Sequence, residues 1–162
     1  MTQEEYNKCV DLYSDRVYRF ILKNVQNEAD AQDVVQNSFI KMWQNYEKVE
    51  YEKARSFLFT VAYRDMIDQI RKTKRVSHTD ALPENALGVT HSSTNQVKEL
   101  IDRGLNTLSE IQRNVITLKD YEGYNYKEIG EITNLSESQV KVYIFRARKK
   151  LKEFLVSIDN VL

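Results

Sequence analysis

The side chains best suited to chemistry in this sequence are basic, and they gather in one segment near the C-terminus. Residues 135–154, LSESQVKVYIFRARKKLKEF, hold six Lys and Arg side chains, although the whole chain balances 24 Lys and Arg against 24 Asp and Glu. A local excess of cations on a helix is typical of a surface that binds nucleic acid, because cations neutralise backbone phosphates. A solvated basic helix end is the alternative interpretation.

Hydrophobic spacing divides this segment into a buried side and an outward side. At about 100° per residue, one narrow arc of the helix holds four apolar residues that we expect to be buried, namely Val140, Ile144, Ala147 and Leu151. The opposite side presents a mixed set of small, apolar and basic residues: Ser138, Val142, Phe145, Arg146 and Lys149. An arginine on that side could bind a guanine edge with two hydrogen bonds.

The residues before this helix favour a helix-turn-helix motif. A short helix is predicted over YKEIGEIT and a turn over NLS, and a capping box of Ser136 and Gln139 begins the basic helix. In such motifs the outward face of the second helix enters the major groove. Four further basic residues are then positioned for backbone phosphates: Lys141, Arg148, Lys150 and Lys152.

A second basic stretch lies in the first half of the chain, on a helix expected from about Ser56 to Lys74. Between Lys53 and Arg75 there are seven basic residues against two acidic ones, and aromatic residues alternate with them. Cations interleaved with rings suit nucleic acid, since rings stack on unpaired bases. A basic helix end that complements its own dipole, with the aromatic residues buried, explains the pattern equally well.

The segment NEADAQDVVQNSFIKMWQNY predicts another amphipathic helix, capped by Asn27 or Asp30. Its expected buried face consists of Ala31, Val35, Phe39, Met42 and Tyr46. A second stripe, roughly a quarter to a third of a turn away, consists of Asp33, Gln36, Ile40 and Trp43. Apolar anchors beside polar groups are typical of protein-binding surfaces, although Ile40 and Trp43 could instead widen the core contact.

Residues that could support catalysis are few and scattered. His78 and His91 both lie in a segment rich in Ser, Thr and Asn, and the single cysteine, Cys9, has no evident partner. We find neither a glycine-rich phosphate-binding motif nor a cluster with metal-ligand spacing. We therefore expect no enzymatic activity, no metal site and no cofactor.

Composition favours an all-α protein, and the chain carries no sign of export or membrane insertion. Four glycines and one proline among 162 residues leave little signal for sheet. No apolar run approaches the roughly twenty residues that span a bilayer, and no signal peptide is recognisable, so we expect a cytoplasmic protein. The polar stretch around Pro83 predicts a flexible linker over residues 75–95, which would join two small helical domains, residues 1–74 and 96–162.

Two of these segments resemble parts of one protein family. DAQDVVQNSFIKMWQNY resembles the polymerase-binding helix of bacterial sigma-70-family factors, and YKEIGEITNLSESQVKVYIFRARKKLKEF is similar to their promoter-reading helix-turn-helix. With these two units and a short linker, the chain resembles the extracytoplasmic-function (ECF) sigma factors over nearly its whole length. The resemblance implies a region 2 helical bundle, a region 4 helix-turn-helix domain, and a protein that binds core RNA polymerase for promoter-specific initiation of transcription with DNA melting.

The resemblance assigns a partner to each surface. Five residues would bind the clamp helices of the polymerase beta-prime subunit: Asp33, Gln36, Asn37, Ile40 and Trp43. The loop from Tyr46 to Arg55 and the helix after it would engage the minus-ten element, with contacts from Arg55, Arg64, Arg71 and Lys72. The minus-thirty-five element would be read by Ser138, Lys141, Val142, Phe145, Arg146 and Lys149. An anti-sigma factor is the remaining partner that the family implies.

Three departures from the family pattern affect promoter preference more than family membership. Asn37 stands where the family often has glutamate, Tyr63 and Arg64 lie near the expected site of the melted bases, and Glu137 lies at the DNA-proximal end of the recognition helix. The alternative function is a stand-alone helix-turn-helix regulator that binds DNA without polymerase. Co-purification of core polymerase would distinguish the two functions.

Overall fold

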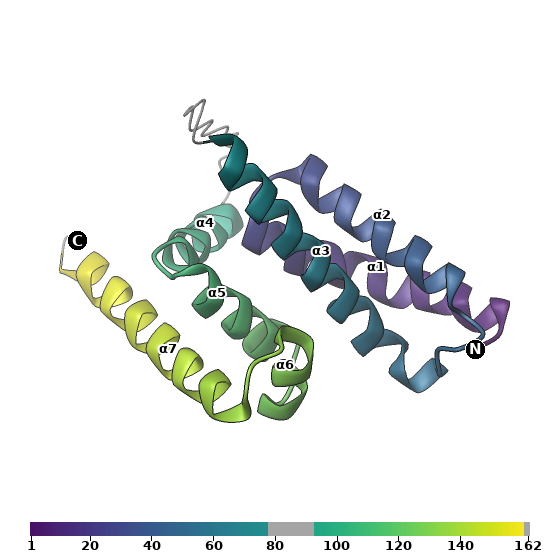
Figure 1. The fold of residues 1–162 in the computed structure, drawn as a ribbon. Helices are drawn as coiled ribbons and strands as arrows, with labels where there is room; N and C mark the ends of the chain where they lie inside the picture. The colour runs from purple at the N-terminus through teal and green to yellow at the C-terminus, as the bar shows by residue number, and fades with distance from the viewer. Residues whose placement is uncertain (78–92, 161–162) are drawn as a thin grey trace.

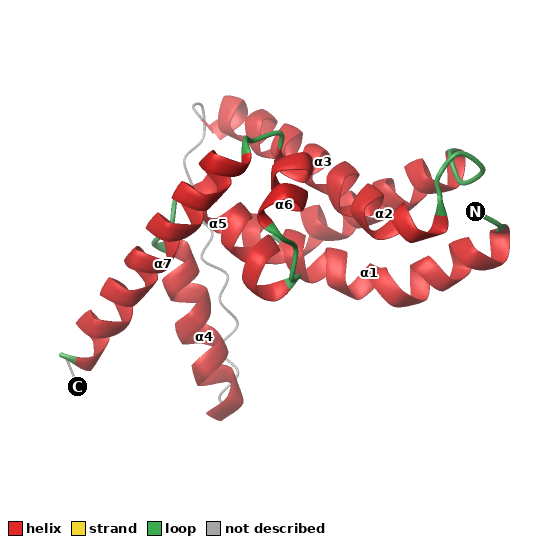
Figure 2. Ribbon diagram, turned by 90° about the horizontal axis from the view of Figure 1, so that it is seen from below, coloured by secondary structure: helices red, strands yellow, loops and turns green. Residues whose placement is uncertain are grey.

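The computed structural model describes residues 1–77 and 93–160, and these residues are almost entirely helical (Figure 1). The N-terminal bundle consists of α1 (Gln3–Val25), α2 (Glu28–Gln44), a short 3₁₀ turn, η1 (Tyr51–Lys53), and α3 (Ala54–Ser77). The C-terminal unit consists of α4 (Ser93–Asn106), α5 (Glu110–Ile116), a π-helical turn, η2 (Thr117–Tyr121), α6 (Tyr126–Thr133) and α7 (Glu137–Asp159). The described residues contain no strand, which confirms the predicted all-α fold (Figure 2).

The predicted linker falls largely outside the residues that the structure describes. α3 continues to Ser77 and α4 begins at Ser93, so both ends of the predicted 75–95 segment are helical. His78, His91 and Pro83 lie outside the described residues. The division into domains of residues 1–74 and 96–162 therefore stays a prediction.

Polar side chains at the helix N-termini determine where several helices begin. The capping box predicted for Ser136 and Gln139 is present, with a backbone-to-hydroxyl distance of 3.1 Å, and the spacing of Ser109 and Gln112 gives a second box, at 3.3 Å. Asn27 is the cap of α2, and its Oδ1 accepts from Asp30 N at 3.0 Å. These caps satisfy backbone donors that have no partner inside the helix, and so they anchor the starts of α2, α5 and α7.

The core of the N-terminal bundle forms where the three long helices pack against one another. The predicted buried face of α2 is only partly right, because Ala31, Phe39 and Met42 are buried but Val35 and Tyr46 are half-buried. Val34 is fully buried instead. The reason is that α2 packs against α1 and α3 at once, so its contact face is wider than a single stripe.

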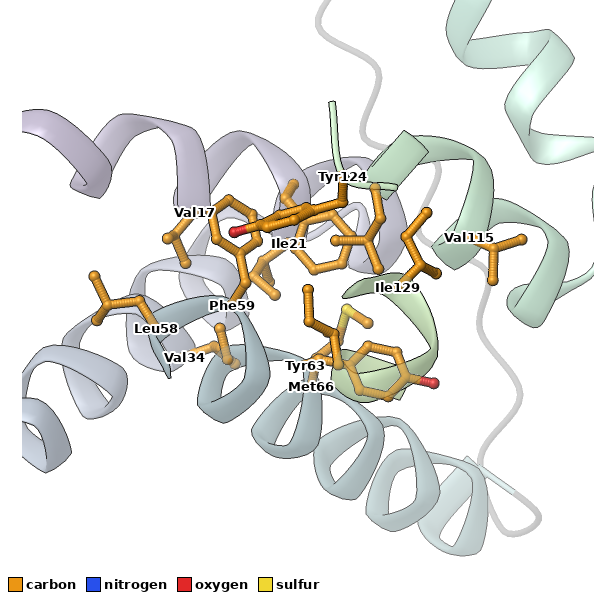
Figure 3. Close-up of a cluster of buried hydrophobic side chains, with 14 of the residues drawn as sticks. Val17, Ile21, Val34, Leu58, Phe59, Tyr63, Met66, Val115, Tyr124 and Ile129 are labelled. Carbon is orange, nitrogen blue, oxygen red and sulfur yellow. The ribbon is translucent and has the colours of Figure 1, made fainter. Parts of the chain in front are cut away.

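The C-terminal unit packs against the N-terminal bundle, chiefly through α6 on α3 and through η2 and α5 on α1 (Figures 1 and 3). Phe59 and Met66 of α3 are fully buried, as is Ile129 of α6. The ring centroids of Phe59 and Tyr124 lie 5.4 Å apart in an edge-on pair. We call this compact placement of the two parts the closed arrangement. A flexible linker such as the one predicted for residues 75–95 does not by itself determine whether the two parts associate.

Gly130 permits the tight turn of the helix-turn-helix. A Cβ atom at Gly130 would lie 2.7 Å from the carbonyl oxygen of Leu135, closer than real Cβ contacts come. Leu135 N donates to Gly130 O at 3.0 Å, and Asn134 has a left-handed φ of 60°. This close approach of the turn to α6 sets the direction of α7. The buried face of α7 is the predicted one, with Leu151 half-buried and the other members fully buried: Val140, Ile144 and Ala147.

We expect Gly130→Ala to lower the free energy of unfolding by about 1–3 kcal/mol, the usual cost of overpacking. The opposing gain in helix propensity is only about 1 kcal/mol, and the backbone of Leu135 cannot move aside as a flexible side chain can. Denaturant unfolding followed by circular dichroism measures the difference. Gly104→Ala is the matched control, because its Cβ would meet only side-chain atoms of Leu151 and Phe154, at 3.2 Å. A Gly130→Ala variant as stable as Gly104→Ala would contradict this account of the turn.

Candidate functional site

The outer side of α2 carries an apolar pair among polar residues. Ile40 is 47% exposed and Trp43 is 44% exposed, so these side chains are not core residues. The other members of the predicted polymerase-binding set are exposed or, in the case of Asn37, half-buried: Asp33, Gln36 and Asn37. Asp33 is also anchored to α3, since Gln69 Nε2 donates to its Oδ2 at 3.1 Å. The structure therefore favours an interaction surface over the wider core contact that the spacing had left open.

Aromatic packing fixes the orientation of Trp43. Its ring lies 5.0 Å from the Tyr6 ring at an interplanar angle of 63°, and 5.0 Å from the Tyr46 ring at 17°. Tyr6 OH donates to Phe39 O at 2.9 Å, which ties α1 to α2 beside the tryptophan. Edge-on and stacked neighbours restrict an aromatic side chain to one orientation. Trp43 thus presents a preformed apolar contact to solvent.

The loop between α2 and α3 borders an open cavity of about 350 Å³, lined by Asn45, Lys48, Val49, Glu50, Lys53 and Phe57. The Met1 nitrogen donates to the carbonyl oxygens of Tyr46 and Val49, each at 2.8 Å, and so braces the loop. Phe57 supplies a ring, and two lysines supply positive charge. A ring next to cations is the chemistry that holds an unstacked base and its phosphate.

The predicted minus-ten residues divide between two sides of α3. Arg64, Arg71 and Lys72 are exposed, and Arg64 and Arg71 share one side of the helix because seven residues span almost two turns. Arg55 lies nine residues before Arg64 and so points to the opposite side, where its side chain is 28% exposed. There its Nη2 donates to the Glu122 carbonyl oxygen. The structure therefore places Arg64 and Arg71 on one side of α3, leaves the neighbouring Lys72 exposed, and separates Arg55 from them.

Tyr63, singled out as a departure near the expected melted bases, is 9% exposed. It lies among the apolar side chains that join α3 to the C-terminal unit (Figure 3). Burial raises the pKa of its phenol, while a hydrogen bond with Asn114 lowers it by a smaller amount. In the closed arrangement Tyr63 is therefore covered by the C-terminal unit.

The outward side of α7 is open along its whole predicted length. All six residues expected to read DNA are exposed: Ser138, Lys141, Val142, Phe145, Arg146 and Lys149. Phe145 is 70% exposed and Val142 is 45% exposed, although both are apolar. Apolar side chains in such a position suit the thymine methyl group, and Arg146 suits a guanine edge. Glu137, at the first residue of α7, pairs with Lys141 at 3.8 Å.

Two cations that the spacing assigned to phosphates have internal partners instead. Arg148 Nη2 donates to Asp120 Oδ1 at 2.8 Å, and this hydrogen bond raises the pKa of the Arg148 guanidinium. Lys150 Nζ donates to the carbonyl oxygen of Thr107 at 3.2 Å. Both contacts fasten α7 to the rest of the C-terminal unit. The partners are 28 and 43 residues away in sequence, which is why helical periodicity could not reveal them.

The described residues were also searched for groups that could bind a metal ion or act as a nucleophile. Within residues 1–77 and 93–160, no group of three or more His, Cys, Asp or Glu side chains could hold a metal ion. Cys9 is fully buried, and this burial raises the pKa of its thiol, which disfavours the nucleophilic thiolate. A search of the same residues finds no helix with the length and hydrophobicity needed to span a bilayer.

Comparison with known proteins identifies the same two units. The Sigma-70 region 2 family model matches residues 9–76, and the Sigma-70, region 4 model matches residues 98–151. The ECF RNA polymerase sigma factor SigM of Bacillus subtilis (strain 168) is 33% identical over 153 residues, covering 90% of this chain and 92% of SigM. SigW of the same organism is 28% identical over 168 residues, covering 94% of this chain and 90% of SigW.

A solved structure has the same fold. It is the sigma factor RpoE in complex with the anti-sigma factor NepR from Bartonella quintana, with a TM-score of 0.81 and 22% sequence identity, covering 94% of this chain and 97% of RpoE. The two matched family regions contain the exposed α2 stripe and most of the open face of α7. The chain therefore belongs to the ECF RNA polymerase sigma factors of the sigma-70 family.

Proposed function

We propose that this chain binds core RNA polymerase through α2 and directs it to promoters that α3 and α7 recognise. The observation that carries the proposal is the exposed Ile40 and Trp43 pair in the same chain as the open recognition face of α7. A stand-alone DNA-binding regulator needs only the second of these surfaces, whereas an initiation factor needs both. The work of such a factor is done by binding, in the cytoplasm, and requires no catalytic residue and no nucleotide hydrolysis.

The α2 surface has the anatomy of a small, specific protein interface. Ile40 and the braced Trp43 form its apolar centre, and the polar residues Asp33, Gln36 and Asn37 form its rim. Buried aromatic anchors supply most of the affinity in such interfaces, and rim residues set orientation. The expected partner is the clamp-helix coiled coil of the beta-prime subunit, which would complete the apolar contact.

Duplex recognition is assigned to α7. The N-terminal half of this helix would enter the major groove of the minus-thirty-five element, with Ser138, Val142 and Arg146 toward base edges and Lys141 and Lys149 toward phosphates. Phe145 adds an apolar contact that suits a thymine methyl group. The internal ties of Arg148 and Lys150 hold the helix at a fixed angle to the unit that carries it.

Strand separation at the minus-ten element is assigned to the loop 45–53 and to α3. Opening a duplex costs about 1.4 kcal/mol per base step in stacking. A base stacked on an aromatic ring, such as Phe57 in the loop cavity, returns about 1–3 kcal/mol. Arg64, Arg71 and Lys72 would hold the backbone of the captured strand. Captured bases can therefore offset most of the cost of melting.

An anti-sigma factor is the third proposed partner. The structurally similar RpoE was solved in complex with the anti-sigma factor NepR, and the similar CnrH was solved in complex with the cytosolic domain of CnrY. An anti-sigma factor that covers the α2 stripe and the α7 face would block both proposed activities at once. Both surfaces are open in this structure.

We expect Ile40→Asp to weaken binding to core polymerase by about 30-fold or more, the effect of removing an interface residue worth roughly 2 kcal/mol. Stability should change by less than about 0.5 kcal/mol, because Ile40 is already exposed. Binding is measured with purified core enzyme, and transcription is measured from promoters of the source genome.

Leu12→Asp is the matched control, since Leu12 is a 54% exposed aliphatic residue on α1, outside the predicted set. It should bind core polymerase like the unmodified protein. If Ile40→Asp bound core polymerase as tightly as the unmodified protein, the α2 surface would not be part of the interface. Absence of core binding by the unmodified protein would leave the stand-alone regulator as the better function.

Substitutions on α7 should separate base reading from phosphate contact. We expect Arg146→Ala to cost about 1–3 kcal/mol on the best promoter and to relax the preference at one base pair. Lys149→Ala should weaken all duplexes alike and reduce the salt slope of binding by about 0.9. Selection from a randomised duplex library, followed by titration at several salt concentrations, measures both effects. Arg148→Ala, which breaks the Asp120 contact, should instead lower stability with base preference unchanged.

A further inference from the structure

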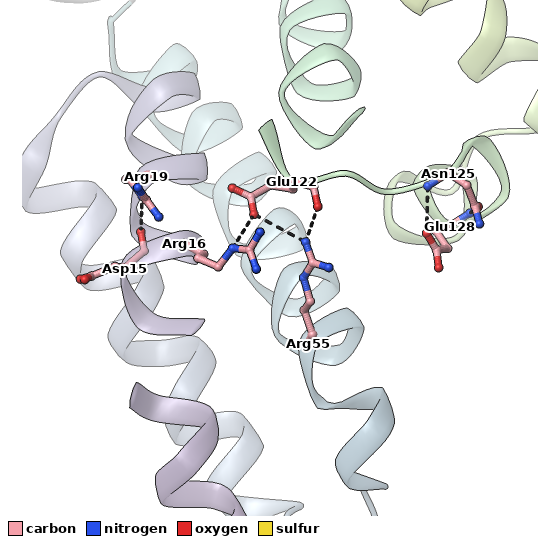
Figure 4. A network of polar contacts seen from close by, with 7 residues as sticks. All are labelled: Asp15, Arg16, Arg19, Arg55, Glu122, Asn125 and Glu128. Atoms are coloured by element: carbon pink, nitrogen blue, oxygen red, sulfur yellow. Dashed lines mark hydrogen bonds and ion pairs between the residues drawn. The ribbon is translucent and has the colours of Figure 1, made fainter. Parts of the chain in front are cut away.

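Glu122 is a buried acidic residue at the boundary between the two parts of the molecule. It follows η2, and its side chain is 6% exposed. Its Oε2 lies 3.4 Å from Arg16 Nε of α1 and 3.8 Å from Arg55 Nη2 of α3 (Figure 4). Arg55 also donates to the backbone carbonyl oxygen of Glu122. Two guanidinium groups from two helices of the N-terminal bundle thus converge on one residue of the C-terminal unit.

The cations around Glu122 form a cluster that belongs entirely to the N-terminal bundle. Arg16 and Arg55 are in direct contact with the carboxylate, and Arg19 and Lys23, one and two turns further along α1, act on it at longer range. Lys23 Nζ also lies 4.7 Å from the centre of the Tyr121 ring. With the C-terminal unit moved away, this cluster would lose its only contacting acidic partner among the described residues.

Glu122 fits this cluster poorly. Its Oε2 is buried and accepts no hydrogen bond from the described residues, and the Nε of Arg55 is buried without an acceptor. Burial raises the pKa of the Glu122 carboxyl by more than Arg16, Arg55, Arg19 and Lys23 together lower it. Burying a charge costs more than an ion pair returns unless the geometry is good. The closed arrangement is therefore held by its apolar contacts, and the basic cluster is left incompletely satisfied.

We propose that Arg16 and Arg55 form a binding site for a backbone phosphate of promoter DNA, which Glu122 occupies in the closed arrangement. The inference rests on the proposed function, and it adds α1 to the DNA-binding surface. A phosphate offers more acceptor oxygens than one carboxylate oxygen, so it can satisfy both forked guanidinium groups, including the buried Nε of Arg55. Arg19 and Lys23 then extend the positive surface along α1.

The position of the site indicates nucleic acid rather than a small free anion. Arg55 is two residues from Lys53 and two from Phe57, both of which line the cavity proposed for the unstacked base. Two residues along α3 turn Arg55 about 200° away from Phe57, so a strand reaches Arg55 by continuing from the cavity around the first turn of that helix. The guanidinium of Arg55 is now 4.4 Å from the centre of the Tyr124 ring and covered by the C-terminal unit, so the strand can reach it only after the two parts separate.

The test compares full-length variants by fluorescence anisotropy with a labelled single-stranded oligonucleotide of twelve thymidines, over a range of salt concentrations. Glu122→Gln keeps the side-chain shape but leaves Arg16 and Arg55 without an anionic partner, and removing one partner of a buried ion pair destabilises the state that buries it. The variant should therefore open more readily and bind the probe roughly threefold or more tightly than the unmodified protein. Adding Arg16→Gln to Glu122→Gln should abolish that gain and reduce the salt slope by about 0.7, the value for one phosphate contact on a single strand.

Two matched controls separate the site from general charge effects. Glu110→Gln removes another carboxylate that joins the two parts, through Lys74 at 2.8 Å, and should give less gain than Glu122→Gln. Lys8→Gln, on the same helix as Arg16 but exposed and outside the cluster, should not abolish the gain in the Glu122→Gln background. Circular dichroism melts of each variant establish that the proteins are folded.

Three results would overturn the inference: no gain with Glu122→Gln, an equal gain with Glu110→Gln, or a double variant with Arg16→Gln that binds as tightly as Glu122→Gln alone. Binding of each variant to core polymerase is measured in parallel. A protein that fails to bind core polymerase but shows the predicted probe pattern would contradict the proposed function and leave the phosphate site standing. A protein that binds core polymerase but does not show the predicted probe pattern would contradict the phosphate site and leave the proposed function standing.

Discussion

The structure depends on one helix, α3, that is packed from two directions. On one side it completes the N-terminal bundle with α1 and α2, and on another it receives α6 of the C-terminal unit. This double burial explains why its apolar residues run around so much of the helix, with Leu58, Phe59, Ala62 and Met66 all fully buried. Along the buried stretch only a narrow side remains for solvent, with Arg64 and Asp68 exposed on it, and from Arg71 to Val76 every residue is exposed. The helix that would touch melted DNA is thus also the helix on which the closed arrangement is built.

The distribution of charge also follows from how the helices pack, because several ion pairs join one element to another. The chain is neutral overall because it has 24 basic and 24 acidic residues, and several of the acidic residues pair with a cation of another element: Asp65 binds Lys41 at 2.9 Å, Asp120 binds Arg148 at 2.8 Å, and Glu110 binds Lys74 at 2.8 Å. On the recognition face of α7, Arg146 and Lys149 have no acidic partner among the ion pairs of the described residues. Neutrality of the whole chain is therefore compatible with a strongly basic surface, since net charge says nothing about where the charges lie.

Local patterns predicted those parts of the molecule that local interactions determine. The capping boxes at Ser109 and Ser136 and the buried face of α7 follow from spacing within one helix, and the structure confirms them. The predicted α2 face was only partly right, since Val34 is buried whereas Val35 and Tyr46 are half-buried, because two helices rather than one pack against it. Arg55 could not be understood from sequence, since its partner Glu122 is 67 residues away. A lone glutamate beside a glycine gives no local signal of an interdomain contact.

The closed arrangement also implies an order of events for the proposed function. The α2 stripe and the α7 face are both exposed while the two parts are in contact, so polymerase binding and duplex recognition do not require separation. Arg55 and Tyr63 are covered, so capture of the minus-ten strand does require it. Polymerase and the minus-thirty-five duplex, bound to the two parts at the same time, pull Tyr124 and Ile129 away from α3 if they hold those parts farther apart than the closed arrangement allows. A partner shifts the equilibrium toward the open state only when it has a higher affinity for that state. A sigma factor built this way would expose its strand-capturing residues only when it is already placed on a promoter, which limits non-specific binding of single-stranded nucleic acid by the free protein.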